Sequence, residues 1–500
     1  MKLSRVVLSG GLFWVTMTSS VFAQTPTPYD SGLTEPFITP APVTGRTLSV
    51  TAYNENAIRT ALNTAVAGDE IYLPDGLYTI TSGDIPLKSG VSIRGQSRIG
   101  TILQTSLTAQ PYAVFTAAQG TTNFTLSHFS INLNPGTTPT KSGIRLGTGT
   151  PINDNSTYLP VTRVRLDDLL IEGYEKFGVQ LENTIHVEVQ NSLIRNAAAL
   201  GDGGQGYGIM VAFDQSRDNW FHDNDIGPVI RHGILMQYRA HHNLVEHNTV
   251  YDTVSDAIDF HGEDEYSNEV RYNTVSNCPQ NYSAGIGVGE FSGTIGSTTE
   301  HDNSGPHNWI HHNEVYNCVY GLRIVNNSNY TYIEDNSFHH NVTAGVQADL
   351  APMDHIYFFR NIIQNNPQGV RLTDVTYAYL ESNTITQNLG YGLWTNLGTT
   401  NYYIVGNTIT NNGINVYLGS PNGYYSSATP TPTPLPTVSP SPTPSATPAP
   451  ATDLDGDIDT DLRDLLQFLG FFGGTGQGDF NNSGRVDVFD FSLLVANFGR

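Results

Sequence analysis

The chain has 500 residues and a formal net charge of −23, from 46 Asp plus Glu against 23 Lys plus Arg. A surface of this charge repels nucleic acid and anionic lipid, so neither is expected as a partner. Only four lysines occur, which disfavours a lysine-based mechanism, and 49 glycines with 14% charged residues suit a turn-rich all-β protein.

Residues 1–23 have the pattern of a cleaved secretory signal peptide. Lys2 and Arg5 precede an apolar run, and Val21 and Ala23 supply small residues at −3 and −1 of the predicted cleavage site. The apolar run is too short to span a bilayer, and no later stretch is long enough. An uncleaved anchor is the alternative. The sequence therefore predicts a secreted or cell-surface protein with no membrane span after removal of the signal.

The next segments lead into the main domain. Residues 24–45 are rich in Pro and Thr and are expected to be an extended lead-in. An amphipathic segment follows, with Ile58 and Leu62 at helical spacing after Asn54 or Asn56 as the cap. A helix ahead of the first strand is expected to cover the open end of a stacked sheet, because uncovered edges invite aggregation.

From about residue 120 the sequence repeats, with most spacings between 22 and 25 residues. Each repeat has an Asn ahead of a short apolar stretch, at Asn191, Asn224, Asn248, Asn273, Asn313, Asn336, Asn361, Asn383 and Asn407. Between these lie Gly-apolar pairs such as Gly233-Ile234, and the Asn side chains are expected to form amide ladders between coils. This period predicts a parallel β-helix over residues 46–425, since the consensus leucines of a leucine-rich repeat are missing.

Two insertions interrupt the period, over residues 197–205 and 290–307. The second carries several acidic and His residues, and long loops on a regular scaffold either carry function or are simply tolerated. Cys278 and Cys318 each lie five residues after a turn Asn, so they occupy equivalent sites in consecutive coils. Coils about 4.8 Å apart permit a disulfide, with two stacked free thiols as the alternative.

A candidate catalytic site follows from the alternation of side chains along each strand. If Ile258 points inward, Asp259 and His261 point outward side by side, with Gly287 leaving open floor in the next coil. Arg323 occupies the same column one coil further, roughly 10 Å from Asp259. We predict Asp259, His261 and Arg323 as catalytic residues of a site beside the second insertion.

This set of residues suits an acidic sugar. Cleaving or epimerising a uronate requires a group that neutralises the carboxylate, a base at the adjacent carbon and a proton donor. Hydrolysis instead requires two carboxylates, which Asp256, Asp259 and Glu263 could supply. Acidic turn residues can also bind a structural calcium or be merely solvated. Gln237 and Glu263 near the pair, and Trp394 as a stacking ring or packing residue, are candidate substrate-binding residues.

Residues 426–450 are rich in Pro, Thr and Ser and are predicted to be a stiff linker. Beyond it, oxygen-bearing residues fall at positions 1, 3, 5, 7, 9 and 12 of two loops, where position 7 offers its backbone carbonyl to Ca²⁺. The first loop has Asp453, Asp455, Asp457, Asp459, Asp461 and Asp464, and the second has Asp479, Asn481, Ser483, Arg485, Asp487 and Asp490. Residues 451–500 are thus predicted to be a small α-helical EF-hand-like calcium domain, with a solvated acidic tail as the alternative.

Two family resemblances extend these predictions. The coils, together with residues 67–78 and 90–95, resemble the right-handed β-helix of the pectin-lyase-like superfamily, which implies that fold but not one function. The segment Ile258-Asp259-Phe260-His261 resembles the Asp-Pro-His-Asp site of mannuronan epimerases. Phe260 replaces the Pro and Gly262 the second Asp, so a catalytic role is implied only for Asp259 and His261.

The doubled calcium loops resemble a dockerin. Asp464 and Asp490 at position 12 fit that family, whereas Ile458 departs from the Gly that Gly484 provides in the second loop. The resemblance implies docking to a cohesin-like or cell-surface partner. The sequence as a whole predicts a secreted all-β protein, a right-handed parallel β-helix with an N-terminal capping helix, which acts as a lyase or epimerase on a uronate-containing polysaccharide. The alternative is a non-catalytic carbohydrate-binding or adhesion protein.

Overall fold

The computed structural model describes residues 40, 42–107, 111–133, 142–150, 157–201, 204–280, 283–290, 303–350 and 352–426, and isolated positions from 454 to 494. The chain divides into two units, Met1–Thr429 and Pro430–Arg500. The predicted signal peptide, most of the lead-in and the linker after residue 426 lie outside the described residues. All calcium-loop positions except Arg485 also lie outside them.

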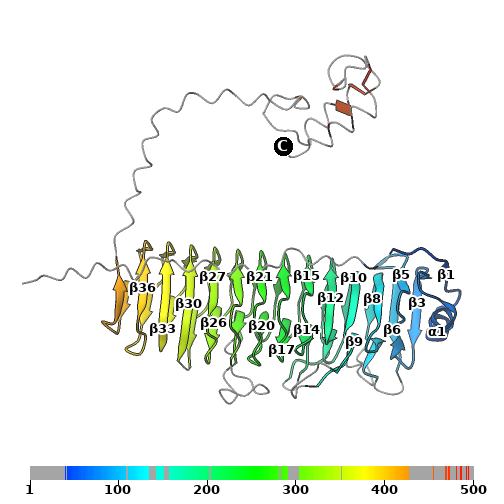
Figure 1. Cartoon of the computed structure of the whole chain (residues 1–500), viewed down its shortest axis with the longest axis horizontal. Helices are drawn as coiled ribbons and strands as arrows, with labels where there is room; N and C mark the ends of the chain where they lie inside the picture. Colours follow the sequence, from blue (N-terminus) through cyan, green and yellow to red (C-terminus); the bar gives the residue numbers. More distant parts are fainter. Residues whose placement is uncertain are drawn as a thin grey trace, which may run out of the picture. The chain divides into compact units, whose positions relative to one another are not determined.

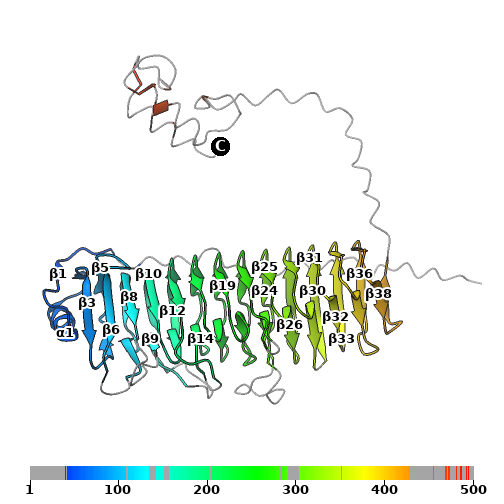
Figure 2. The ribbon, with the colours of Figure 1, turned by 180° about the vertical axis from the view of Figure 1, so that it is seen from behind.

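The first unit is a stack of coils in which each strand pairs in parallel with its counterpart one coil away, as β17 (His232–Gln237) does with β20 (Ile258–Phe260) (Figure 1). In most coils, three successive strands go to three separate ladders; β18, β19 and β20 are one such set. Seen from behind, β19, β25 and β31 follow one another along the stack (Figure 2). The predicted parallel β-helix is confirmed over the described residues.

The 13-stranded sheet is one ladder along the whole stack and carries the candidate site. Its strands are β4 (Ile85–Pro86), β7 (Ala113–Ala117), β9 (Ser142–Gly147), β11 (Phe177–Glu182), β14 (Tyr207–Ala212), β17, β20, β23 (Ala284–Val288), β26 (Tyr320–Val325), β29 (Ala344–Asp349), β32 (Gln368–Leu372), β35 (Tyr391–Thr395) and β38 (Ile414–Leu418).

The 26-stranded sheet contains the other two ladders, which the long strands β8 (Thr122–Asn132) and β10 (Val161–Glu172) join. The first of them has β1 (Thr47–Ser49), β2 (Glu70–Leu73), β5 (Ser92–Gly95), β12 (Thr184–Gln190), β15 (Trp220–His222), β18 (Leu244–Glu246), β21 (Glu269–Arg271), β24 (Trp309–His311), β27 (Thr331–Glu334), β30 (Met353–Phe359), β33 (Val375–Glu381), β36 (Tyr402–Val405) and β39 (Gly423–Tyr425). The second has β3 (Gly76–Ile80), β6 (Thr101–Thr105), β13 (Leu193–Arg195), β16 (Asp225–Ile226), β19 (Thr249–Tyr251), β22 (Thr274–Ser276), β25 (Glu314–Tyr316), β28 (Ser337–His339), β31 (Ile362–Gln364), β34 (Thr384–Thr386) and β37 (Thr408–Thr410).

Helix α1 (Glu55–Thr64) lies at the β1 end of the stack (Figure 1). Of the two Asn residues predicted as its cap, Asn54 is the N-cap, because its Oδ1 accepts a hydrogen bond from the backbone N of Ala57 at 3.0 Å. Ile58 and Leu62 are buried in the main core. Within the described residues, no helix is long and apolar enough to cross a membrane.

Amide ladders stabilise the turns of the coils. From Asn224 to Asn383, each predicted Asn donates its side-chain Nδ2 to Oδ1 of the Asn one coil further on, at 2.9–3.0 Å, and Asn407 is the last acceptor. The prediction for Asn191 is wrong. Ser192 occupies the ladder position, since its backbone N donates to Oδ1 of Asn224, and the exposed Asn191 bonds Asp167 instead. A second ladder, which the sequence analysis missed, joins Asn341, Asn366, Asn388 and Asn412.

Cys278 and Cys318 form a disulfide between consecutive coils, with their Cα atoms 4.2 Å apart. Both cysteines are fully buried. The backbone N of Cys318 donates to Oδ1 of Asn341, so the disulfide occupies the column that the second amide ladder continues. Of the second unit, the described Phe468, Val486 and Leu494 pack together.

Candidate active site

Three strands of the 13-stranded sheet position the site: β17, β20 and β23. The register pairs Leu235 with Asp259, Asp259 with Gly287, and Gly287 with Arg323. This is the outward column predicted from alternation. The neighbouring inward residues, Ile258 among them, are fully buried in the core, so the packing of the coil fixes the direction of Asp259.

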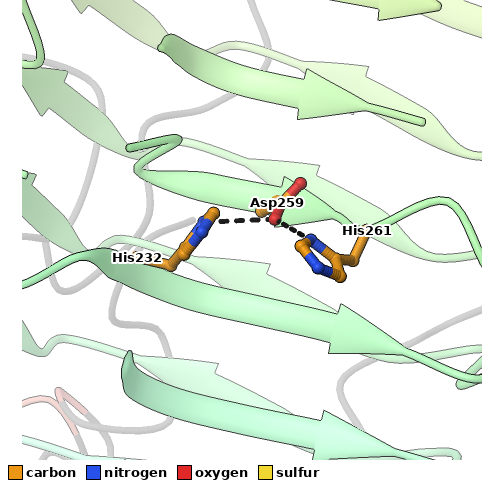
Figure 3. A group of neighbouring side chains, drawn as sticks. All are labelled: His232, Asp259 and His261. Atoms are coloured by element: carbon orange, nitrogen blue, oxygen red, sulfur yellow. Dashed lines mark hydrogen bonds and ion pairs between the residues drawn. The ribbon is translucent and has the colours of Figure 1, made fainter. Parts of the chain in front are cut away.

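Asp259 and His261 form a close pair (Figure 3). Nδ1 of His261 lies 2.7 Å from Oδ2 of Asp259, and the two side chains are 10% and 2% exposed. The backbone N of His261 donates to the carbonyl of Met236 in the preceding coil, which fixes the histidine at the end of β20. His261 is therefore the member of the pair that a molecule outside the protein reaches first.

His232 is a third member of the cluster, which the sequence analysis missed. Its Nδ1 lies 3.1 Å from the same Oδ2 of Asp259, and its side chain is 2% exposed. The imidazole meets the rings of Tyr207 and His261 edge to face, with centroids 4.9 and 5.6 Å apart. Asp259 thus stands between two imidazoles from adjacent coils (Figure 3).

The open floor predicted over Gly287 is wrong, because the carboxylate of Asp256 fills that space. A Cβ atom at Gly287 would lie 2.3 Å from Oδ2 of Asp256 and 3.3 Å from Oδ1 of Asp259. Oδ1 of Asp256 accepts a hydrogen bond from the backbone N of Ala284. Asp256, interpreted from sequence as a turn residue or as one of two hydrolytic carboxylates, therefore lies beside the Asp259 carboxylate in the site.

The charges of the cluster are divided unevenly. Burial lowers the pKa of His261, but the Asp259 carboxylate more than offsets it and raises the pKa to about 10. Burial opposes ionisation of Asp259 too, yet the two imidazoles hold its pKa well below the usual range. Burial lowers the pKa of His232. Burial and the Asp259 carboxylate raise the pKa of Asp256. The groups are thus set to different protonation states by their surroundings.

The turn after β20 is built on two fully buried carboxylates. Glu265 accepts hydrogen bonds from the backbone N of Gly262, the backbone N of Glu263 and Oγ of Ser304, the last at 2.6 Å. Burial raises the pKa of Glu265, as does the neighbouring Glu263. Glu263, predicted to bind substrate, is 0% exposed and acts electrostatically on His261.

The downstream end of the second insertion is anchored on this turn. Nδ2 of Asn303 donates to Oδ1 of Asp264 at 3.0 Å, and the backbone N of Asp264 donates to the carbonyl of Asn303. At the upstream end, the carbonyl of Glu290 accepts a hydrogen bond from Nδ2 of Asn326. Residues 291–302 lie outside the described residues. Both described ends of the insertion thus flank the Asp259–His261 pair.

The remaining predicted site residues lie at different distances from the pair. Arg323 shares the column with Asp259 two coils on, about 10 Å away by coil spacing; it forms an ion pair with Asp349 at 3.2 Å and lies over the ring of Tyr320. Gln237 is buried at the end of β17, one coil before His261. Trp394 lies five coils from Asp259, about 24 Å by the same spacing, with Arg371 over its ring. The structure therefore does not bring Trp394 together with the pair.

The arrangement can move a proton. A carboxylate that fixes one imidazole nitrogen leaves the other to donate or accept at a bound molecule, and such groups supply general acid–base catalysis. The side chains of His232, Asp259 and His261 also bring one nitrogen or oxygen donor each within 4.8 Å of one another.

The coils match a known protein family and resemble solved structures. The family described as "right handed beta helix region" matches residues 162–338 and 297–421. Among solved structures, the chain is similar to the A-module of the mannuronan C-5 epimerase AlgE6 from Azotobacter vinelandii, at 19% identity and a TM-score of 0.51 over 74% of this chain and 93% of that one.

Two further solved structures show weaker likeness. The A-module of the epimerase AlgE4 from the same organism gives 15% identity and a TM-score of 0.47, over 76% of this chain and 100% of that one. An alginate lyase from Paenibacillus sp. str. FPU-7 gives 17% identity and a TM-score of 0.37, over 68% and 94%. No curated protein matches the chain. At these identities the similarity shows the fold alone.

Proposed function

Because this chain belongs to the right-handed β-helix family, which it matches from residue 162 to residue 421, we propose that it is a polysaccharide-active enzyme, a lyase or epimerase of chains that contain uronic acids. The observation that carries the proposal is the Asp259–His261 pair, held 2.7 Å apart on an outward column of a rigid sheet. An ion pair this deeply buried is costly, so its presence at a sheet face between two insertions argues for chemistry.

In this proposal His261 is the group that reaches the sugar, because it is the more exposed member of the pair. Its ring, which the Asp259 carboxylate keeps protonated, donates a proton to the reacting sugar, and Asp259 fixes the direction of the ring. We propose that Arg323, two coils from Asp259, binds an acidic group of a neighbouring sugar, since sugars of an extended chain and coils repeat at comparable intervals. Gln237 would border the same subsite, and the fully buried Glu263 would act on it through its charge near His261.

The proposal extends to where the protein works. We propose that residues 1–23 direct secretion, and that residues 451–500 bind calcium and dock the enzyme to a cohesin-like or cell-surface partner. The supports are the signal-like N-terminus and the doubled calcium-ligand spacing in the sequence. Trp394 remains a proposed stacking residue for a distant part of the sugar chain.

The experiment is a substrate panel. The full chain is incubated with mannuronan, polygalacturonate, chondroitin and a neutral glucan, with calcium or a chelator; mannuronan comes first because the epimerase module of the same fold acts on it. Ultraviolet absorbance detects unsaturated ends, reducing-end assays detect any cleavage, and proton NMR in D₂O detects exchange at the epimerised carbon. We expect turnover on one acidic polymer and none on the glucan.

Variants connect turnover to the pair. Asp259→Asn and His261→Ala should lower the rate by about 10²- to 10⁴-fold, the usual contribution of an acid–base group. The matched control is His311→Gln, which removes another buried imidazole, one that pairs with Glu269 in the 26-stranded sheet. Equal rates for the two site variants and the control would refute the role of the pair.

The rival proposal is a non-catalytic carbohydrate-binding or adhesion protein. Its support is the low exposure of the cluster, 2% for both His232 and Asp259. Binding of an acidic polysaccharide in calorimetry, with no product and no proton exchange on any substrate, would favour this rival over the enzyme. Hydrolysis by Asp256 and Asp259 would instead yield reducing ends without unsaturation.

A further inference from the structure

Three donor atoms converge at the centre of the site. Oδ2 of Asp259 lies 2.7 Å from Nδ1 of His261 and 3.1 Å from Nδ1 of His232, and one donor atom from each residue can be chosen with all of them within 4.8 Å of one another. The three residues come from two adjacent coils whose strands pair in register (Figure 3). Donors fixed on neighbouring rungs of one sheet are positioned with little freedom, as a metal site requires.

His232 supplies a second, independent observation. The side chain is 2% exposed, yet neither ring nitrogen makes a hydrogen bond of acceptable geometry within the described part of the chain. Buried polar nitrogens in proteins are nearly always satisfied, by protein, water or a bound ion. The ring is aimed at the Asp259 carboxylate, so a ligand between them would satisfy it (Figure 3).

We infer that His232, Asp259 and His261 form a binding site for one divalent transition-metal ion of the Zn²⁺ class. Two imidazoles and one carboxylate are the donors that such ions prefer, and three protein ligands leave at least one position open. Calcium is disfavoured here because it takes six to eight oxygen ligands. The ring nitrogens would need to separate only slightly from Oδ2 to admit an ion at about 2.0–2.2 Å from each donor.

The surroundings favour a cation. The Asp256 carboxylate lies next to Asp259, and Glu263 and Glu290 act electrostatically on His261. Arg323, two coils from Asp259, forms an ion pair with Asp349 and also acts electrostatically on Asp256. A bound dication would offset this negative charge and present an open position to an anion. That this anion is a uronate carboxylate rests on the proposed function; metal binding itself does not.

The test uses the full chain without a polyhistidine tag, stripped of metal with a chelator and kept in excess calcium so that the predicted C-terminal loops are filled. Zn²⁺ is added in a calorimeter, and elemental analysis after gel filtration gives the stoichiometry. We expect one Zn²⁺ per chain for the wild type and for the control His311→Gln. His232→Gln, Asp259→Asn and His261→Gln should each weaken binding by more than 100-fold, since loss of a mere outer-shell partner already costs 10- to 100-fold.

Co²⁺ provides a measurement that needs no variant. Bound by two imidazoles and a carboxylate at a site with low coordination number, it should give visible d–d absorption without a thiolate charge-transfer band, because both cysteines are in a disulfide. Near-ultraviolet circular dichroism and melting temperature check that each variant is folded.

Each outcome decides the inference. Failure of the wild type to bind Zn²⁺, or one Zn²⁺ retained equally by all three folded variants, would overturn it and leave a His–Asp–His cluster that binds no metal. One Zn²⁺ bound without product from any polysaccharide would uphold the metal site and remove the proposed function. Product formation by a wild type that binds no Zn²⁺ would overturn the metal site and uphold the proposed function.

Discussion

At the scale of single residues, Gly287 is the position on which the two aspartates of the site depend. Asp256 and Asp259 approach each other over its bare backbone, and an added Cβ would lie 2.3 Å from Oδ2 of Asp256. No other residue type leaves that space. The glycine therefore allows the second carboxylate to reach the site from the coil before it.

We expect Gly287→Ala to fold but to lose activity. The added methyl group displaces Asp256, breaks its hydrogen bond with the backbone N of Ala284 and moves Asp259. Overpacking of this kind lowers the free energy of unfolding by about 1–3 kcal/mol. A shift of about 1 Å at a reacting group can lower the rate by about 100-fold. Melting temperature and the product assay measure the two effects. The control is Gly201→Ala, whose Cβ would meet only the side chain of Gln205. Unchanged activity in Gly287→Ala would show that Asp256 has no part in the site.

The residues that the sequence analysis missed have a common physical cause. Strict alternation from the inward Ile234 would put His232 inside as well. In the structure the strand bends at Gly233, whose added Cβ would meet the core residue Val250, so two consecutive residues face inward and His232 faces out. The register skips this glycine, since Tyr207 pairs with His232 and Ile209 with Ile234. Gly233 corresponds to Ala257 in the next coil. Alternation predicted the direction of Asp259 and His261, which follow these positions, but not that of His232 and Asp256, which precede them.

A histidine outside the site makes the fold sensitive to acid. Burial lowers the pKa of His241 to about 4, helped by the neighbouring His242, with smaller effects of Arg217 and Asp218. An exposed imidazole titrates near 6.5, so between about pH 4 and 6.5 the unfolded chain binds more protons than the folded chain. The stability that neutral His241 contributes is complete above about pH 6.5 and is lost as the pH falls towards 4.

His241→Phe should reduce this acid sensitivity. Phenylalanine keeps the stack on Tyr266, where the ring centroids are 4.5 Å apart, and removes the titrating group. The variant also loses the contact of Nε2 with the carbonyl of Asp214, which lowers stability at every pH. Melting temperatures at pH 7.5 and 5 separate the two effects. If the variant loses as many degrees between these values as the wild type, another group causes the acid sensitivity.

At the scale of the repeating element, the amide ladder links each coil to the next through hydrogen bonds between Asn side chains. Asn273 sits in the middle of it: its Nδ2 donates to Oδ1 of Asn313 and to the carbonyls of Val245 and Arg271, and its Oδ1 accepts from Asn248. The bonds to Asn248, Asn313 and Val245 are buried, and the bond to Arg271 is partly buried. Removal of the side chain therefore leaves several buried partners unsatisfied.

Asn273→Ala should destabilise the β-helix by about 1–3 kcal/mol for each buried group left unpaired, whereas Asn191→Ala should change stability by about 0.5 kcal/mol or less. Asn191 has the same sequence context but is exposed and outside the ladder. Thermal and urea unfolding give the stability of the two variants. The steepness of each transition is also compared, because stacked coils can unfold in parts. Equal effects would show that the ladder hydrogen bonds add nothing beyond the surface ones.

The same pair of residues shows how far a period predicts a ladder. The spacing of Asn and apolar residues identified the coils from Asn224 onward, because buried amides must recur at one height of every turn. At Asn191 the spacing placed the ladder residue one position too early, since Leu193 is partly exposed and Ile194 is the core residue of that coil. The exposed Asn191 adopts the left-handed conformation, with φ of 51°, which Asn tolerates well. An Asn chosen for this conformation does not mark a buried ladder position. Local sequence signals could not distinguish these two uses of Asn.

At the scale of the whole molecule, a net charge of −23 must be reconciled with a proposed acidic substrate. A polyanion approaching such a surface is repelled unless positive charge is concentrated where it binds. The β-helix offers Arg323 and the inferred ion at the His232–Asp259–His261 cluster, and the C-terminal unit is predicted to hold calcium elsewhere. The two proposed metal classes differ in donors, nitrogen-rich in the coil and all-oxygen in the loops, so they can be separated chemically.

The calcium prediction is tested in the full chain. Asp453→Ala with Asp479→Ala removes the first ligand of both loops, and calorimetry should then show the loss of two calcium equivalents that the wild type binds. Asp259→Asn should bind calcium like the wild type, because oxygen-poor donors at the coil site do not select that ion. Calcium should also protect residues 451–500 from proteolysis in the wild type and not in the double variant, since ordering of these loops is coupled to binding. Wild-type protein that takes up no calcium, or a double variant that takes up as much, would contradict an EF-hand-like domain and leave an acidic tail in its place.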